Sequence, residues 1–365
     1  MAELHFDQTG FGWIISAFSI AYAASSLVTG WFLDRVGVNR GIVAAVSWWS
    51  AAAVSTAAVN SLGGLAACRV ALGIGESAGV PATGKLNGLY LKSEEFALGA
   101  ALNQIGLSAG LAIAPLFISM AAAHTWRRPF VITGLLGFVW VPIWLAVSRA
   151  IPPQRRNPPI VRAVGSILKS RSLLLLVVAN VLWMGGYSLW SNWTTLYLIH
   201  VQHITLIESA RYVWIPPLIS NLGGFFGGWL SLRWIRRGFD AVSARRRACW
   251  VSALASLTTL LLPFAPGAGW ATAIISLSFF FSLSGSVNIY SLPIDLFGPA
   301  RAGLAIAALT CAFGILQTVI SPIIGFLGDH KLYNQVIWIA TIPLILSSLV
   351  LQPLRRDESA DVGVG

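Results

Sequence analysis

The chain has 365 residues, of which 56% are hydrophobic and only 10% are charged. Soluble domains carry about 25% charged residues, so this composition excludes an ordinary soluble protein and predicts a polytopic membrane protein. The formal net charge is +11. The basic residues lie in short gaps between apolar runs, which argues against a nucleic-acid-binding patch.

Eleven apolar runs are long enough to cross a bilayer, and we therefore predict an all-α fold with eleven transmembrane helices. Five of them lie in the first half of the chain, at residues 11–32, 41–59, 62–84, 97–122 and 129–148. The other six lie at residues 171–199, 210–232, 248–265, 269–297, 302–327 and 333–353.

The basic residues predict the orientation of these spans. Nineteen of the 24 Lys and Arg residues fall in alternate gaps, and cytoplasmic loops carry the excess of Lys and Arg in membrane proteins. These gaps are therefore expected to be cytoplasmic, together with a C-terminal tail over residues 354–365. An odd number of spans then places Met1 on the outer side.

Residues 149–170 are rich in Pro and Arg, and we predict a cytoplasmic linker there between two helical bundles. An ordinary loop is equally compatible with these residues. The bundles would comprise residues 1–148 and 171–353. A similarity between two segments of the chain supports two related halves. The sequences GWFLDRVGVNR (30–40) and GGWLSLRWIRRG (227–238) both place glycines near a helix end before a basic turn.

Arg69 and Glu76 are opposite charges inside a stretch of membrane-like composition, since no Asp, Glu, Lys or Arg occurs from Gly41 to Cys68. Seven residues are close to two helical turns, so both side chains project from one face, about 10 Å apart. A charge in lipid costs several kcal/mol, so it is expected to face the protein interior or a water-filled path. The pair therefore predicts a translocation pathway, with a structural ion pair as the alternative.

A loop motif resembles the signature G-x-x-x-D-R-x-G-x-x-R of the major facilitator superfamily; its residues are Gly30, Asp34, Arg35, Gly37 and Arg40. Glycine lets two helix ends approach, and the Asp can pair with Arg across the gap. The resemblance implies a two-bundle transporter fold and a role for these residues in a cytoplasmic gate. The alternative is an ordinary charged loop with a glycine turn.

The segment Arg69-Val-Ala-Leu-Gly-Ile-Gly-Glu76, followed by Pro81-Ala82, resembles the fourth helix of the anion:cation symporter family. Members of its hexuronate-type branch carry sugar acids together with protons. The resemblance implies that Arg69 attracts or orients an anionic substrate and that Glu76 takes and releases the coupling proton.

Further polar residues in apolar spans match the same family or suit sugar hydroxyls. We predict substrate contacts from Tyr22, Asn103, Gln104, Asn288, Tyr290 and Gln317. For each residue taken singly, an interhelical hydrogen bond is at least as compatible as a ligand contact.

Family members have twelve spans, and this chain begins where their second span is expected. Its start, MAELHFDQTGFGWI, resembles the periplasmic loop that leads into that helix. Either the chain starts at an internal Met, with the first helix encoded upstream, or the first helix is truly lacking.

Metal and enzyme chemistry are not indicated. The spacing of His200 and His203 would suit two metal ligands, but no carboxylates lie nearby in the sequence. The three cysteines are isolated from one another. No arrangement of Ser, His and Asp or of Cys and His stands out among five histidines. We expect no metal and no cofactor, with the proton gradient as the driving force.

The sequence thus predicts proton-coupled symport of a small organic anion, of hexuronate, aldonate or glucarate type, by a monomer in the cell inner membrane. Efflux of a drug-like compound is one alternative. A transport-dead membrane protein or sensor is the other.

Overall fold

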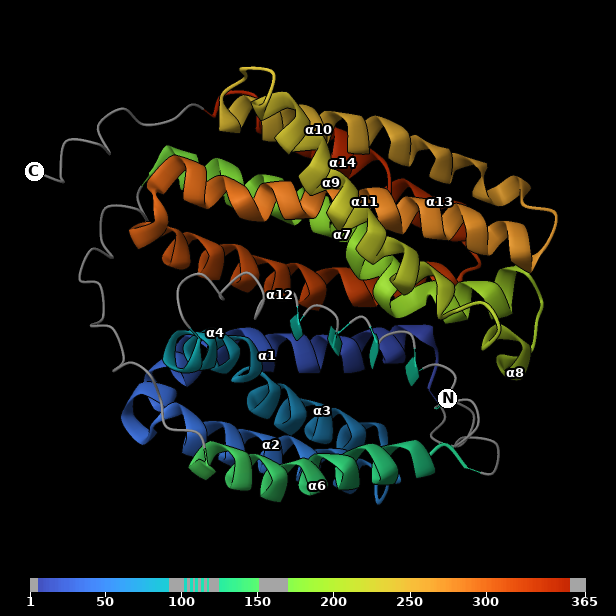
Figure 1. The fold of residues 1–365 in the computed structure, drawn as a ribbon. Helices are drawn as coiled ribbons and strands as arrows, with labels where there is room; N and C mark the ends of the chain where they lie inside the picture. Colours follow the sequence, from blue (N-terminus) through green and yellow to red (C-terminus); the bar gives the residue numbers. More distant parts are fainter. Residues whose placement is uncertain are drawn as a thin grey trace, which may run out of the picture. The chain divides into compact units, whose positions relative to one another are not determined.

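The computed structural model describes residues 6–91, 125–150 and 170–354, with isolated positions between 102 and 117. Every secondary-structure element in these ranges is a helix (Figure 1). The chain divides into two compact units. The first contains Met1–Pro159 together with Gln317–Asp329, and the second contains Ile160–Leu316 together with His330–Gly365.

The first unit is built from α1 (Gln8–Val36), α2 (Val38–Thr56), α3 (Leu62–Glu76), α4 (Gly79–Tyr90) and α6 (Arg128–Ala150). Helix α1 packs along α3, and α2 packs along α6. At the cytoplasmic end predicted from the sequence, a buried apolar cluster joins α1, α2 and α4; its members are Leu33, Val38, Ile42, Val46 and Ala82.

The second unit is built from nine helices in the described ranges. They are α7 (Arg171–Val201), α8 (Leu206–Ser209), α9 (Ile215–Ile235), α10 (Ala241–Ala255), the 3₁₀-helix η2 (Ser256–Phe264), α11 (Ala268–Phe297), α12 (Pro299–Asp329), α13 (Tyr333–Ile339) and α14 (Ile342–Val350). Helix α12 begins in the second unit, and its last residues, Gln317–Asp329, belong to the first.

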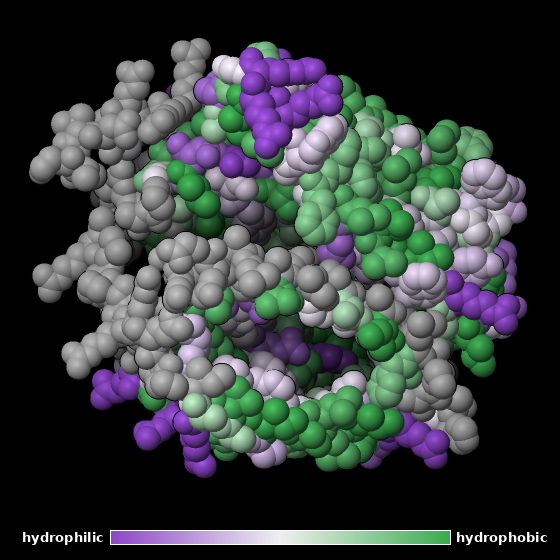
Figure 2. All heavy atoms as spheres, viewed as in Figure 1, coloured by the Kyte–Doolittle hydropathy of each residue, from purple (hydrophilic) through white to green (hydrophobic). Residues whose placement is uncertain are grey.

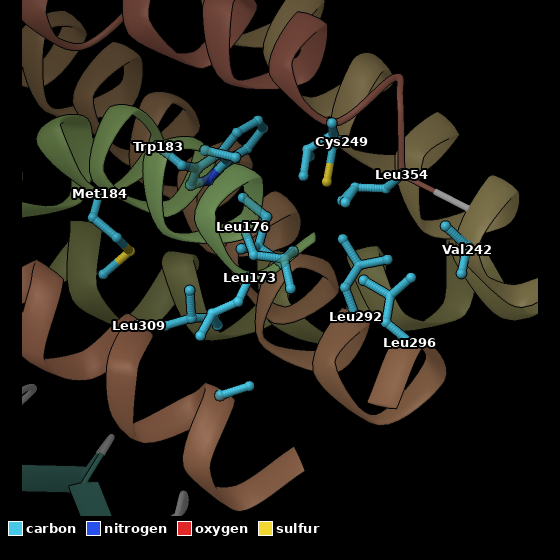
Figure 3. Close-up of a cluster of buried hydrophobic side chains, with 14 of the residues drawn as sticks. Leu173, Leu176, Trp183, Met184, Val242, Cys249, Leu292, Leu296, Leu309 and Leu354 are labelled. Atoms are coloured by element: carbon cyan, nitrogen blue, oxygen red, sulfur yellow. The ribbon is translucent and has the colours of Figure 1, made fainter. Parts of the chain in front are cut away.

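The core of the second unit is apolar and draws on five helices (Figure 3). Leu176 and Trp183 of α7, Cys249 of α10 and Leu292 of α11 are all fully or almost fully buried. Helices α9 and α11 approach closely at glycines: a Cβ added at Gly227 would lie 2.1 Å from the Ser284 carbonyl oxygen. Only glycine permits this separation, as expected for helices that pack through small residues in a membrane.

Helices occupy ten of the eleven predicted spans, while the span at 97–122 lies largely outside the described residues. Within the described ranges, six helical stretches are long and apolar enough to cross a membrane. They are Arg128–Ala150, Arg171–Val201, Ala241–Phe264, Ala268–Phe297, Leu304–Asp329 and Tyr333–Val350. The exact number of membrane crossings thus stays a prediction.

Two of the predicted spans are interrupted. The span at 62–84 divides into α3 and α4, and the last span divides into α13 and α14 at Ala340 and Thr341. The predicted linker at 149–170 and the tail at 354–365 lie almost wholly outside the described residues. The division of the chain at Pro159 falls inside that linker, but the assignment of Gln317–Asp329 to the first unit differs from the predicted boundaries.

Candidate substrate and proton site

Gly73 sets the distance between α1 and α3. A Cβ added at Gly73 would lie 2.5 Å from the Phe18 carbonyl oxygen and 3.1 Å from the Tyr22 backbone nitrogen. Real Cβ atoms do not approach a carbonyl oxygen this closely, so the contact requires glycine. It brings the α1 segment that carries Tyr22 against the α3 segment that lies between Arg69 and Glu76.

Glu76 is the last residue of α3, and the chain makes a short turn at Ser77 and Ala78 before α4 begins at Gly79. The sequence explains the interruption, because Pro81 has no N–H group and cannot bond to the Ser77 carbonyl four residues earlier. The Thr29 hydroxyl of α1 lies 3.4 Å from that carbonyl oxygen. Glu76 therefore lies at an irregular point of the backbone, which membrane proteins tolerate where it is enclosed by protein or lines a cavity.

The structure brings three predicted site residues together in the first unit. Glu76 interacts electrostatically with Arg69 on its own helix and with Tyr22 on α1. All three side chains are partly buried. The group combines a cation, an acid and a hydroxyl, which are the functional groups needed to bind a hydroxylated anion and to hold a proton.

Arg69 has an aromatic neighbour on a third helix. Its guanidinium carbon lies 5.2 Å from the centre of the Phe130 ring on α6. A cation held over a ring face keeps its charge and its N–H donors, because the ring satisfies it by electrostatic attraction alone. Arg69 is thus oriented by Phe130 without having its hydrogen-bonding capacity consumed.

The predicted gate residues lie at one end of α1. Gly37 adopts a positive φ of 87° between α1 and α2, and its N–H donates to the Leu33 carbonyl. The Gly30 carbonyl accepts a hydrogen bond of 3.0 Å from the Lys85 ammonium on α4. Arg35 and Arg40 are exposed. Asp34 lies within α1, and its side chain is outside what the structure describes.

The two similar sequence segments, residues 30–40 and 227–238, also share a backbone feature. Gly238, which follows α9 in the second unit, has a φ of 89°, close to that of Gly37 after α1. Gly37 directly follows α1 and Gly238 lies in the turn after α9, and both have the positive φ that other residues adopt at a cost.

Asn103 is exposed and lines a cavity of about 460 Å³ with Asn87, Tyr90 and Trp144. Gln104 lies outside the described residues. Gln317 on α12 is partly buried, and its side-chain carbonyl oxygen has no hydrogen-bond partner among the described residues.

Asn288 lies at a helix contact. It is fully buried, and its amide nitrogen donates to the Gly227 carbonyl on α9 at 3.0 Å and to the Ser284 carbonyl at 2.9 Å. The bond to Gly227 links α11 to α9 where that glycine brings the two backbones together, and the bond to Ser284 lies within α11. This geometry favours the interhelical alternative for Asn288.

Tyr290 of α11 belongs to a second polar group, in the second unit. Its hydroxyl lies within hydrogen-bonding reach of the Asn180 side chain on α7 and the Thr310 side chain on α12. Asn180 is fully buried and its amide nitrogen also donates to the Leu309 carbonyl at 2.9 Å, while its side-chain oxygen has no partner among the described residues. Sequence reasoning missed Asn180 and Thr310, although Asn180 meets the same criterion as Asn103, an amide in an apolar span.

Comparison with known proteins agrees with this architecture. A model of the Major Facilitator Superfamily matches residues 1–315. The hexuronate transporter of Escherichia coli K12 is 24% identical over 383 residues, covering 99% of this chain and 88% of the relative. The galacturonate transporter of Dickeya chrysanthemi is 27% identical over 250 residues, covering 63% and 72%.

Solved structures show the same fold. A bacterial homologue of the human lysosomal transporter Spinster, in an inward-facing and unoccupied conformation, has a TM-score of 0.75 at 16% identity, covering 95% of this chain and 89% of that chain. The nucleoside transporter NupG has a TM-score of 0.75 at 12% identity. The chain belongs to the Major Facilitator Superfamily: it is a membrane transporter and not an enzyme, and its relatives include sugar-acid transporters.

Proposed function

We propose that this protein is a proton-coupled symporter of a small organic anion, with sugar acids as the substrate class. The observation that carries the proposal is the convergence of Tyr22, Arg69 and Glu76 across the α1–α3 contact at Gly73. The relatives that carry hexuronate and galacturonate support the choice of substrate class.

The proposed roles follow from the chemistry of the three side chains. Arg69 binds the substrate carboxylate, because a guanidinium offers paired N–H donors to a carboxylate. Glu76 holds the coupling proton. Substrate entering beside Arg69 changes the electrostatic field at Glu76, so substrate binding and proton binding are linked. In this proposal the Tyr22 hydroxyl bonds to a substrate hydroxyl.

Alternating access of the two units completes the proposed cycle, with Asp34, Arg35 and the glycines of the loop motif at the cytoplasmic gate. We propose a bacterial inner-membrane location, a cytoplasmic C-terminus and a monomeric transporter. The driving force is the proton gradient, and the cycle needs no bound cofactor.

The test is uptake of radiolabelled galacturonate into proteoliposomes that have an inward proton gradient. The wild-type protein should accumulate the label, and Arg69→Gln should abolish accumulation. Arg211→Gln is the control, because Arg211 is an exposed arginine beyond α8 and its loss should leave uptake intact.

The two rival functions predict different results. A drug exporter should move a cationic dye, and Arg69→Gln should spare or improve that transport. A transport-dead protein should show substrate binding, or none, without accumulation of any label. Either result would overturn the proposal.

A further inference from the structure

We propose that the end of the second unit where α9 meets α10 binds the headgroup of an anionic phospholipid. Four exposed arginines gather there, namely Arg233, Arg236, Arg237 and Arg247. Figure 2 shows a strongly hydrophilic patch at the top of the view, and Figure 1, drawn from the same side, labels α10 in that region. This inference does not depend on the transported substrate.

The neighbouring arginines are already engaged by the protein. Arg245 forms an ion pair with Asp295 on α11. The Arg246 guanidinium donates to the carbonyls of Gln352 and Leu354 after α14. Asp240, the acid in this loop, accepts the Ser243 N–H at 2.9 Å and caps α10. Asp240 supplies one negative charge against the four exposed arginines, so within the part of the chain that the structure describes most of the positive charge of this loop is uncompensated.

Among the described residues, the side chains of Arg236 and Arg237 have no hydrogen bond or ion pair with a protein acceptor. Their guanidinium groups can thus offer all their N–H donors to an external anion. Clusters of four or more basic residues at the end of a membrane helix are typical sites for anionic lipid headgroups.

Aromatic rings hold the other two arginines. Arg233 lies over Trp229 at 5.5 Å, and Arg247 lies over Phe239 at 3.9 Å. Tryptophan is enriched at the membrane–water interface, where its ring meets the headgroup region. The ring contacts orient both guanidinium groups at that depth without neutralising their charge.

Helix α9 continues this site with an exposed apolar stripe of helical spacing that ends at Arg233 and Arg236. Its members are Leu218, Leu222, Phe225, Trp229 and Leu232, and Phe225 is 70% exposed. An acyl chain lying along this stripe would place its phosphate at the arginines.

A second stripe runs along α10 and η2 and begins at Arg247. Its members are Val251, Leu254, Leu257 and Leu261. Because α9 and α10 pack against each other and share the connecting loop, the two stripes offer paths for two acyl chains below one cationic cluster. A glycerophospholipid with a net negative headgroup has this chemistry, whereas a soluble anion would leave the apolar stripes unused.

The experiment measures thermal unfolding of the purified full chain in neutral detergent. Dioleoylphosphatidylglycerol, dioleoylphosphatidylcholine or inorganic phosphate is added, and native mass spectrometry counts the bound lipids. We expect phosphatidylglycerol to raise the unfolding temperature more than phosphatidylcholine does. The double variant Arg236→Gln/Arg237→Gln should weaken phosphatidylglycerol binding on the order of tenfold or more.

The matched control is Arg128→Gln/Arg211→Gln, which removes the same charge at two other exposed arginines and should retain the preference. Equal shifts from the two lipids, an equal loss in the control, or the same shift from inorganic phosphate would each overturn the proposal. If the double variant does not fold, the single variants Arg236→Gln and Arg247→Gln replace it. Weaker phosphatidylglycerol binding in both would support the proposal, and unchanged binding in both would overturn it.

Discussion

Asp329, at the end of α12, caps the beginning of α1 through Thr9. One carboxylate oxygen of Asp329 accepts hydrogen bonds from the Thr9 N–H at 2.8 Å and the Thr9 hydroxyl at 2.6 Å, and the other accepts the Gln8 N–H at 2.8 Å. Next to this cap, a Cβ at Gly325 would lie 2.2 Å from the Gln8 carbonyl oxygen. A carboxylate at a helix N-terminus satisfies free N–H donors and is favoured by the helix dipole.

Asp329→Asn should loosen this contact by about 2 kcal/mol, because hydrogen bonds to a charged acceptor are the strong ones. The reporter is a cysteine placed at Ser16, which is buried and donates to the Thr318 carbonyl at 2.6 Å. In a background without native cysteines, Asp329→Asn should speed maleimide labelling of this position.

Asp240→Asn is the control for that experiment, since Asp240 caps α10 in the second unit. It should leave the labelling rate at position 16 unchanged. An unchanged rate in Asp329→Asn would show that the carboxylate does not hold α1 to the end of α12.

Gly73→Ala should destabilise the first unit by about 1–3 kcal/mol, because the added methyl meets the rigid α1 backbone at Phe18. It should also displace Tyr22 from Glu76 and reduce transport. Thermal unfolding followed by tryptophan fluorescence gives the first effect. Gly63→Ala on the same helix meets nothing within 4 Å and should be neutral or stabilising; equal unfolding temperatures for the two variants would contradict this account.

The sequence was sufficient to predict the candidate site but not its detailed packing. Two opposite charges in an apolar span identify Arg69 and Glu76, because lipid excludes isolated charges. The interruption after Glu76 also had a sequence signal, Pro81, which the expectation of one continuous span did not use. The contact between the start of α1 and the end of α12 is non-local, so no periodicity within either segment could indicate it.

Asn288 shows the same limit from the opposite direction. Asn288 was predicted to contact substrate because it is a polar residue in an apolar span. The direction of its side chain, however, depends on where a glycine on a neighbouring helix lets the two helices approach. Here that residue is Gly227 on α9. Composition alone cannot distinguish the two roles.

Asn288→Ala should therefore lower stability by about 1–3 kcal/mol, since it leaves the buried Gly227 carbonyl without this donor. The KM of the folded fraction for substrate should stay near that of the wild type. Tyr290→Phe removes a hydroxyl at the polar group of the second unit and should raise KM with little change in unfolding temperature. If instead Asn288→Ala raised KM and Tyr290→Phe lowered the unfolding temperature, Asn288 would be a substrate contact and Tyr290 a packing residue.

Glu208, in the loop between α7 and α9, makes helix α8 sensitive to pH. Hydrogen bonds from the Thr205 backbone N–H, then from the Thr205 hydroxyl, hold the pKa of Glu208 below its usual value, with help from Arg211. A carboxyl with a lowered folded-state pKa contributes stability above its unfolded pKa, and that contribution is lost as the pH falls through the folded pKa.

Hydrogen exchange of the α8 amides, corrected for the intrinsic pH dependence, should therefore rise on acidification in the wild type. Glu208→Gln should show high exchange at every pH. A wild-type protection that does not change with pH would contradict the role of the ionised capping box.

The most direct test of the central claim is proton movement driven by substrate. Galacturonate is added to proteoliposomes without a pH gradient, and the external pH is recorded. The external solution should become more alkaline, because protons enter with the anion. Glu76→Gln should give no such signal, yet it should still exchange labelled for unlabelled substrate because exchange needs no net proton transfer. Substrate entry without alkalinisation, or alkalinisation retained in Glu76→Gln, would contradict the assignment of Glu76 as the proton carrier.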